Sequence, residues 1–307
     1  MFLIHYVDII IVNKKDFNLW IYKIWISFIT IYIHYFILDC KLCNSKTTKI
    51  FFKTFSICHN CGCIFNNDFS DRKKLTKDVN YESVYKASKI TKIIKLKFWD
   101  TIAEQYVNYL KSKTNMKFHS VLDVGALYGN FVKRFNDIGI PTIGIESNKE
   151  YLSAEISGKL SHGYFDETFH SDQKFDLICF TQMIYYVKNP ILLIKKSCEL
   201  LTDSGTIFIS TQNPQSPIIL DLKLPQIFES DMNILLSKKN FVDIAQKFDL
   251  KLIDFTNYKP NIYLDRLKNQ TKKSELNNFI KYRFKPPYEK NPNGHHTFLL
   301  LSKSVSN

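Results

Sequence analysis

The segment at residues 121–130 reads VLDVGALYGN, and it decides the fold class. An apolar, β-branched run ends at Gly125, a second glycine follows at Gly129, and a helical pattern begins directly afterwards. This order is typical of a strand that turns into a helix at the carboxyl edge of an α/β sheet, where such sheets bind ligands. Gly125 permits the sharp turn, and Gly129 permits close approach of a ligand to the backbone.

Short β-branched runs and helical patterns alternate after this segment, and an amphipathic helix precedes it. The helix is indicated by apolar residues at three- and four-residue spacing, namely Leu96, Phe98, Trp99, Ile102, Tyr106, Val107 and Leu110. The alternation predicts strands at Val121–Val124, Thr142–Ile145, Phe175–Phe180 and Thr206–Ser210, and helices near 130–138, 148–157 and 190–201. Asn189 and Pro190 form a good helix start. The pattern predicts an α/β fold with a doubly wound, Rossmann-like sheet.

The loop from Gly125 to Gly129, the glycine loop, favours one cofactor over another. Glu146 ends the second strand about twenty residues after the loop, where a carboxylate can accept hydrogen bonds from both hydroxyls of a ribose. A dinucleotide-binding loop carries G-x-G-x-x-G to hold a pyrophosphate. Here the pattern is Asp123-x-Gly125-x-x-x-Gly129, and Leu127 holds the middle glycine position. S-adenosylmethionine contains no phosphate, so the loop favours this cofactor over NAD.

Five of the seven cysteines lie between Cys40 and Cys63. Two Cys-x-x-Cys pairs separated by fourteen residues place four thiolates where a tetrahedral Zn²⁺ can bind them at about 2.3 Å. Four protein ligands leave no open position on the metal, so the predicted zinc is structural. We predict the ligands to be Cys40, Cys43, Cys58 and Cys61. His59 and Cys63 are alternative ligands.

Residues 119–214 resemble the core of the class I S-adenosylmethionine-dependent methyltransferases. The segment 121–129 matches the first motif, apart from Leu127, and Glu146 matches the ribose-binding acid. Phe175–Ile178 matches the fourth strand, and 200–205 matches the turn before the fifth. The resemblance implies a cofactor site formed by Asp123, Gly125, Ala126, Gly129, Glu146, Asp166 and Thr181.

The cysteine-rich segment strengthens this resemblance. The stretch from Cys40 to Phe65, followed by Tyr81 and Tyr85, is similar to the zinc ribbon that precedes the catalytic domain in bacterial methyltransferases of sugar and glycan biosynthesis. The resemblance implies a small-molecule or glycan acceptor, with a nucleotide-linked or lipid-linked sugar hydroxyl as one form of it.

The chain is predicted to have four parts. They are a hydrophobic N-terminal segment at 1–38, a zinc ribbon at 39–67, a helical connector at 68–115 and a methyltransferase domain at 116–304. Residues 19–38 are almost wholly apolar, although Lys23 lies among them. A membrane anchor, an arm packed on the domain and a wrongly assigned start all remain open. We expect a cytoplasmic protein, with membrane association through 19–38 as the alternative.

The catalytic base is not assigned by the sequence. Where the resemblance places a Glu-His pair after the fourth strand, this chain has Tyr185 and Tyr186. An unperturbed tyrosine has a pKa of about 10 and is a poor base at neutral pH. Tyr186 is therefore only a weak catalytic candidate, and packing in the core explains it equally well.

Two C-terminal patterns are given structural interpretations. Lys285-Pro286-Pro287-Tyr288 lies far from the fourth strand and is expected to be a loop punctuated by prolines. His295 and His296 precede a final strand at Thr297–Leu301. Successive strand residues face opposite sides, so at most one histidine can face the cleft, and a surface role is expected.

The composition leaves the partner open. The formal charge is +13, with 42 Lys and Arg against 29 Asp and Glu, but the lysines are scattered and form no basic stripe. The favoured function is therefore methyl transfer to a small molecule or glycan. A zinc-ribbon RNA methyltransferase and a non-catalytic methyltransferase-like binding protein are the alternatives.

Overall fold

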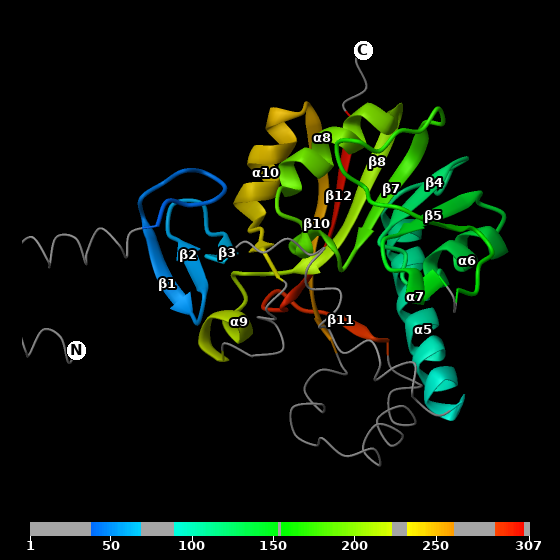
Figure 1. Ribbon diagram of the computed structural model, residues 1–307, viewed down its shortest axis with the longest axis horizontal. Helices are drawn as coiled ribbons and strands as arrows, with labels where there is room; N and C mark the ends of the chain where they lie inside the picture. Colours follow the sequence, from blue (N-terminus) through cyan, green and yellow to red (C-terminus); the bar gives the residue numbers. More distant parts are fainter. Residues whose placement is uncertain (1–37, 69–88, 153–154, 223–231, 261–285, 304–307) are drawn as a thin grey trace, which may run out of the picture.

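The computed structural model describes residues 38–68, 89–152, 155–222, 232–260 and 286–303. Its main sheet has eight strands in the order β11-β10-β12-β8-β7-β4-β5-β6 (Figure 1). Strands β6, β5, β4, β7 and β8 run parallel to one another, whereas β12 is antiparallel to both β8 and β10, and β11 is antiparallel to β10. The strands are β4 (Val121–Val124), β5 (Thr142–Glu146), β6 (Leu160–His162), β7 (Phe175–Thr181), β8 (Leu201–Gln212), β10 (Leu250–Pro260), β11 (Tyr288–Lys290) and β12 (His296–Lys303).

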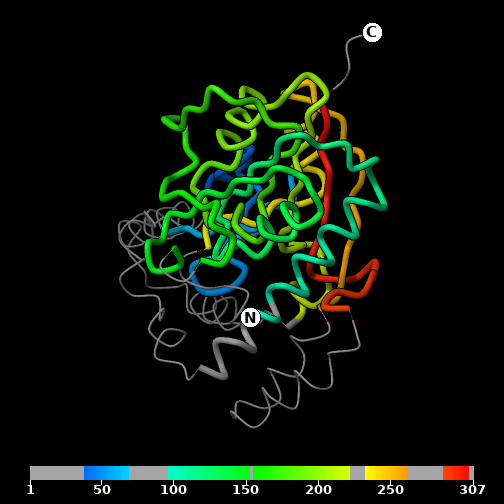
Figure 2. Tube along the Cα trace, turned by 90° about the vertical axis from the view of Figure 1, so that its right-hand side faces the viewer, coloured from blue at the N-terminus to red at the C-terminus, as the bar shows by residue number. Residues whose placement is uncertain are grey.

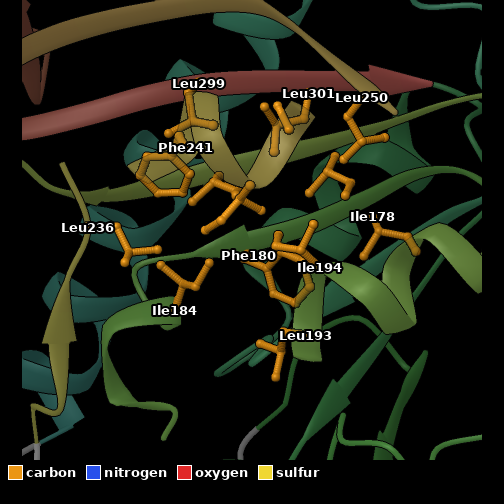
Figure 3. Close-up of a cluster of buried hydrophobic side chains, with 14 of the residues drawn as sticks. Ile178, Phe180, Ile184, Leu193, Ile194, Leu236, Phe241, Leu250, Leu299 and Leu301 are labelled. Atoms are coloured by element: carbon orange, nitrogen blue, oxygen red, sulfur yellow. The ribbon is translucent and has the colours of Figure 1, made fainter. Parts of the chain in front are cut away.

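Helices cover both faces of this sheet and enclose two apolar cores. The helices α5 (Lys89–Lys113) and α6 (Asn130–Asp137) pack on one face, which Figure 2 shows from the α5 side. The helices α8 (Pro190–Leu200) and α10 (Lys238–Lys247) pack on the other. Figure 3 shows this second core, where Leu193 and Ile194 meet Phe180 below the strands. The layers confirm the predicted doubly wound α/β fold.

The α5 face is where the sequence pattern and the packing agree best. The predicted apolar stripe of α5 buries Ile102, Tyr106, Val107 and Leu110, while Leu96 and Trp99 are half-buried. The side chain of Phe98 lies outside the described residues. Since α5 lies over β8 and β12, the stripe brings Tyr106 to within 5.5 Å of the Phe208 ring and 5.1 Å of the Phe298 ring.

Two predicted elements differ from the structure. The helix expected at 148–157 is described only as α7 (Lys149–Leu152), because Ile156 N–H donates to the Tyr128 carbonyl and Glu155 accepts the backbone N–H of Gly158. The turn expected at 200–205 lies inside β8, as an irregularity where the register with β7 shifts. The other predicted strands and helices are confirmed to within a few residues.

A second, smaller sheet joins the cysteine-rich segment to the main domain. It consists of β1 (Thr48–Phe52), β2 (Phe55–Cys58) and β3 (Ile64–Asn66), and it continues onto β9 (Ile234–Leu235) from the later part of the chain. The remaining short helices are α9 (Pro217–Leu222) and the 3₁₀ turn Ile184–Tyr186. The ribbon is therefore bonded to the catalytic part through its edge strand.

Within the described residues, no helix has both the length and the apolar character needed to cross a bilayer. Most of the apolar stretch predicted as a possible anchor, residues 19–37, lies outside the described residues, and only Leu38 is inside them.

Candidate active site and zinc ribbon

Asp123 is a buried carboxylate in the middle of the parallel strands, one residue before the end of β4. Its side chain is 1% exposed, and its Oδ1 atom has no hydrogen-bond partner among the described residues. Burial, with a smaller contribution from the charge of Glu146, raises the pKa of Asp123 to about 8. A buried polar oxygen of this kind is costly unless a ligand satisfies it. An ammonium group such as that of S-adenosylmethionine would fit this requirement.

Glu146 holds the glycine loop against the tip of β5. Its carboxylate accepts the backbone N–H of Leu127 at 2.9 Å and that of Asn148 at 2.8 Å. Leu127 adopts a φ of 54°, the left-handed region that favours glycine. A non-glycine residue there costs on the order of 1 kcal/mol, which the charge-assisted bond to Glu146 offsets. The loop therefore keeps a glycine-like backbone although leucine occupies the position.

The two glycines of the loop are required by its geometry. Gly125 and Gly129 have φ values of 74° and 80°. A Cβ atom on Gly125 would lie 3.2 Å from the Cβ of Met183, and one on Gly129 would lie 2.8 Å from the Oγ of Ser157. A larger residue at either position would strain the backbone and crowd the side chain of Met183 or Ser157. Ala126, between them, is buried.

The two remaining residues of the expected cofactor set lie on other strands. Thr181 ends β7 at the same edge of the sheet and is half-buried. Asp166 follows β6, where its Oδ1 accepts the N–H of Thr168 at 2.9 Å and begins a turn. The carboxyl ends of β4, β5 and β7 thus gather most of the predicted set, while Asp166 lies on the loop beyond β6.

Tyr185 and Tyr186 are held in place by Asn233. Their ring centroids lie 4.5 Å apart, Tyr185 is buried and Tyr186 is half-buried. The backbone N–H of Asn233 donates to the Tyr185 carbonyl at 2.8 Å, and its Nδ2 donates to the Tyr186 carbonyl at 2.7 Å. Both tyrosines therefore have packing roles, and a catalytic role for Tyr186 stays a prediction.

The surface role expected for His295 and His296 is wrong. Both are buried, with 1% and 2% exposure, and their ring centroids lie 4.9 Å apart. The reason is the position of β12 between β8 and β10 inside the sheet, with the Tyr288 ring 5.0 Å from His296. Of the expected loop, Tyr288 lies in β11, Pro286 and Pro287 precede this strand, and Lys285 lies outside the described residues.

A tight turn at Gly294 directly precedes these histidines. A Cβ atom on Gly294 would lie 2.2 Å from the carbonyl oxygen of Tyr258, and the turn is bonded through Asn213 Nδ2 to the Gly294 carbonyl. We expect Gly294→Ala to lower the free energy of unfolding by about 1–3 kcal/mol, the usual cost of overpacking, in denaturant titration. Gly163→Ala, whose Cβ would meet only the Ile145 side chain at 3.3 Å, should change it less. Equal effects would contradict the packing argument.

The predicted zinc ligands lie together. The sulfur atoms of Cys40, Cys43, Cys58 and Cys61 are all within 4.8 Å of one another. The Cys40–Cys61 and Cys43–Cys58 sulfur pairs are each 3.7 Å apart. A tetrahedron with Zn–S bonds of about 2.3 Å has sulfur atoms about 3.8 Å apart, so these four cysteines can bind a structural zinc ion.

The alternative ligands differ in their positions. Cys63 is buried, and its sulfur is 3.4 Å from the sulfur atoms of both Cys40 and Cys61. His59 is exposed and lies outside the group of close ligand atoms.

Hydrogen bonds connect the cysteine-rich ribbon to the start of α10 and to Asn233. The Cys61 carbonyl accepts bonds from Ser237 Oγ at 2.7 Å and Asn240 Nδ2 at 3.1 Å, at the start of α10. In β3, the N–H of Asn66 donates to the carbonyl of Asn233 at 2.8 Å. Because Asn233 also holds the segment after β7, the ribbon contacts the element on which Tyr186 lies.

Residues 97–254, just over half of the chain, match the family described as methyltransferase domain. A ubiquinone biosynthesis O-methyltransferase from Haemophilus ducreyi is 28% identical over 120 residues, which are 34% of this chain and 51% of that protein. The chain thus spans about half the length of this relative.

A solved methyltransferase structure shares the fold. The magnesium protoporphyrin IX methyltransferase of Synechocystis PCC 6803, solved with bound SAH (S-adenosylhomocysteine), superposes with a TM-score of 0.50 at 10% identity, covering 76% of this chain and 100% of that one. A Thermotoga maritima S-adenosylmethionine-dependent methyltransferase, described as a possible histamine N-methyltransferase, gives 0.47 at 14% identity over 69% and 96% of the two chains. The chain belongs to the methyltransferase domain family.

Proposed function

We propose that this enzyme methylates a hydroxyl group of a small-molecule or glycan acceptor at the carboxyl edge of β4, β5 and β7. The observation that carries the proposal is the buried carboxylate of Asp123, whose Oδ1 has no hydrogen-bond partner among the described residues, beside a loop with positive φ at Gly125 and Gly129. We assign cofactor binding to Asp123, Gly125, Ala126, Gly129, Glu146, Asp166 and Thr181.

Each part of this edge has a separate task. The bound cofactor supplies a methyl group that its sulfonium already activates. Asp123 would balance the positive amino group, and Glu146 would accept the ribose hydroxyls while it keeps the Leu127 N–H bonded. The surrounding residues align the acceptor and exclude water.

A hydroxyl acceptor is supported by the relative from Haemophilus ducreyi, which is named as an O-methyltransferase. Methyl transfer to oxygen releases a proton, so the acceptor side needs a group that can take it. The glycan class comes from the resemblance of the ribbon to those of sugar-modifying methyltransferases. The lysines are scattered and form no basic stripe, which favours a small-molecule or glycan acceptor over a nucleic acid.

We propose the four-part division of the chain at 38, 67 and 115 as its domain organisation. The ribbon at 39–67 then supports the acceptor side of the catalytic domain at 116–304. Its bonds to Ser237, Asn240 and Asn233 support this role, because Asn233 fixes the segment after β7.

Calorimetric titration with S-adenosylhomocysteine tests the cofactor site. In Glu146→Gln the side chain keeps its size, but one of its two oxygens becomes a donor. We expect the affinity to fall by about 10- to 100-fold, the value of hydrogen bonds to a charged group. Glu199→Gln is the matched control, because this carboxylate is exposed at the end of α8 and pairs only with Lys196 in the described contacts. The proposal fails if wild-type protein shows no affinity at millimolar ligand.

A further inference from the structure

On the α5 face of the sheet, the side chains change from apolar to polar toward the carboxyl edge. This polar end of the face forms a polar edge. Along β8, Phe208, Ser210 and Gln212 share this face because strand residues two apart point the same way. Strand β12 places Phe298 opposite Ser210 and His296 opposite Gln212. All five side chains are at most 5% exposed. Buried polar groups beside an apolar core are costly, so their presence points to a ligand or a network.

Part of this polar edge is a directed hydrogen-bond network that includes Tyr106. Gln182 Nε2 donates to Ser210 Oγ at 2.6 Å, and Ser210 Oγ donates to the Tyr106 hydroxyl at 3.0 Å. The Tyr185 hydroxyl donates to Gln182 Oε1 at 3.3 Å, which fixes the amide orientation. The Tyr106 oxygen accepts this bond, and Tyr288 is a further side-chain hydrogen-bond partner of the Tyr106 hydroxyl. Burial raises the pKa of Tyr106 to about 12, which keeps this hydroxyl a donor.

The other part of the edge is formed by Gln212, His296 and Tyr288. The Tyr288 ring is stacked with Tyr106, with centroids 6.4 Å apart and planes at 19°, and its centroid lies 5.0 Å from that of His296. The Oε1 atom of Gln212 is buried and has no hydrogen-bond partner among the described residues. This unsatisfied acceptor is an observation independent of the Tyr106 network, and it too indicates a ligand.

The polar edge adjoins the cofactor residues. Thr181 lies opposite Ser210 in the register of β7 and β8, and the charge of Asp123 contributes to the raised pKa of Tyr106. The buried described residues include two carboxylates but no lysine or arginine, so the edge has hydrogen-bonding and aromatic groups without a buried cation. Such a surface suits a hydroxylated ring and not a phosphate.

We propose that Tyr106, Gln212, Tyr288 and His296 bind an uncharged ring that carries the reacting hydroxyl, and that His296 accepts the hydroxyl proton. This inference rests on the proposed function. The acceptor oxygen gains the methyl group, the electron pair of the broken S–C bond stays on sulfur, and the proton passes to the imidazole. Burial keeps the pKa of His296 well below its usual value, so the ring is neutral and able to accept. The hydroxyl becomes strongly acidic as the new bond forms, so a weak base is sufficient.

The test uses full-length protein saturated with S-adenosylhomocysteine and three probes: catechol, methyl glucopyranoside and glucose 1-phosphate. Binding is measured by saturation-transfer NMR, and the His296 imidazole is followed through its ¹⁵N resonances. We expect catechol or the glucoside to bind and to shift these resonances. Affinity should fall by about tenfold in His296→Gln and in Gln212→Leu, as for one lost hydrogen bond. His119→Gln, on an exposed histidine before β4, should bind as wild type does.

Several results would overturn this inference. They are failure of both uncharged probes to bind, binding of the phosphorylated probe alone, and equal binding by wild type and both variants. Calorimetry with S-adenosylhomocysteine on each protein separates the two proposals, because wild type that does not bind it would contradict the proposed function itself. If His296→Gln loses this affinity through misfolding, Gln212→Leu alone decides the outcome.

Discussion

Removal of zinc is expected to speed hydrogen exchange at residues 55–66 by about 1,000-fold or more, while S-adenosylhomocysteine affinity changes by less than about threefold. A ribbon of this size has little core of its own, and structural zinc contributes on the order of 10 kcal/mol to such folds. Among the described residues, the hydrogen bonds given above for the proposed cofactor residues on β4 and β5 involve no residue of the ribbon. Zinc removal should therefore speed hydrogen exchange in the ribbon and leave the affinity of the cofactor site nearly unchanged.

The faster hydrogen exchange caused by zinc removal should extend beyond the ribbon itself. Because β3 pairs with β9 and Asn233 holds the carbonyls of Tyr185 and Tyr186, exchange should also rise at 232–240 and 184–186. Mass-resolved hydrogen exchange with and without a chelator measures this, together with the metal content of the protein. Unchanged exchange at 184–186 would contradict the proposed support of the acceptor side.

Single cysteine substitutions provide the matched comparison for metal removal. Cys58→Ser should lose stoichiometric zinc and reproduce the exchange pattern of the chelated protein. Cys198→Ser should retain the metal, because Cys198 lies on α8, outside the group of close sulfur atoms. Full zinc occupancy in Cys58→Ser would show that Cys63, whose sulfur is 3.4 Å from those of Cys40 and Cys61, replaces it as a ligand.

Asp123→Asn is expected to weaken S-adenosylhomocysteine binding by about 100-fold, the value of a hydrogen bond to a buried charged group. In wild-type protein the affinity should rise with pH by up to about tenfold per unit below pH 8, because Asp123 must lose its proton to face a cation. The variant should lose this slope. Calorimetry from pH 6 to 9 checks both statements, and a wild-type affinity independent of pH would contradict them.

The same residue predicts how the free protein responds to pH. The pKa of Asp123 is raised by burial from 3.8 to about 8, so the folded state holds a proton that the unfolded state releases. This contribution to the free energy of unfolding is fully present below about pH 4 and is lost as the pH rises to about 8. In Asp123→Asn the decrease over this range should be smaller. Asp137→Asn, an exposed carboxylate paired with Lys133, is the control.

Local sequence patterns predicted most of the parallel sheet and the loop that carries the two glycines. The β-branched runs and the two glycines were sufficient because each strand of the parallel sheet is a short buried segment and each turn needs a special backbone. The four predicted zinc ligands followed from spacing alone, and the structure brings their sulfur atoms together. The role of Glu146 in bonding Leu127 was not predictable, since it depends on a contact across nineteen residues.

The residues of the proposed acceptor site were not predicted from the sequence because they come from distant segments. Tyr106 reads as one more apolar position of an amphipathic helix, and His295–His296 read as surface residues at the start of a strand. Only the placement of β12 between β8 and β10 brings them together. The change from Phe208 to Ser210 to Gln212 along one strand face was the available signal, because a fully buried strand seldom ends in polar residues on its inner face.

The pairing of β3 with β9 has a consequence for synthesis on the ribosome. The ribbon is translated early, yet the strand that completes its sheet is reached only at Ile234–Leu235. Until then the nascent chain carries an edge strand with open backbone groups, which is a template for unwanted pairing. A fragment that stops before residue 232 should therefore aggregate even when zinc is supplied, and soluble expression of such fragments would measure this.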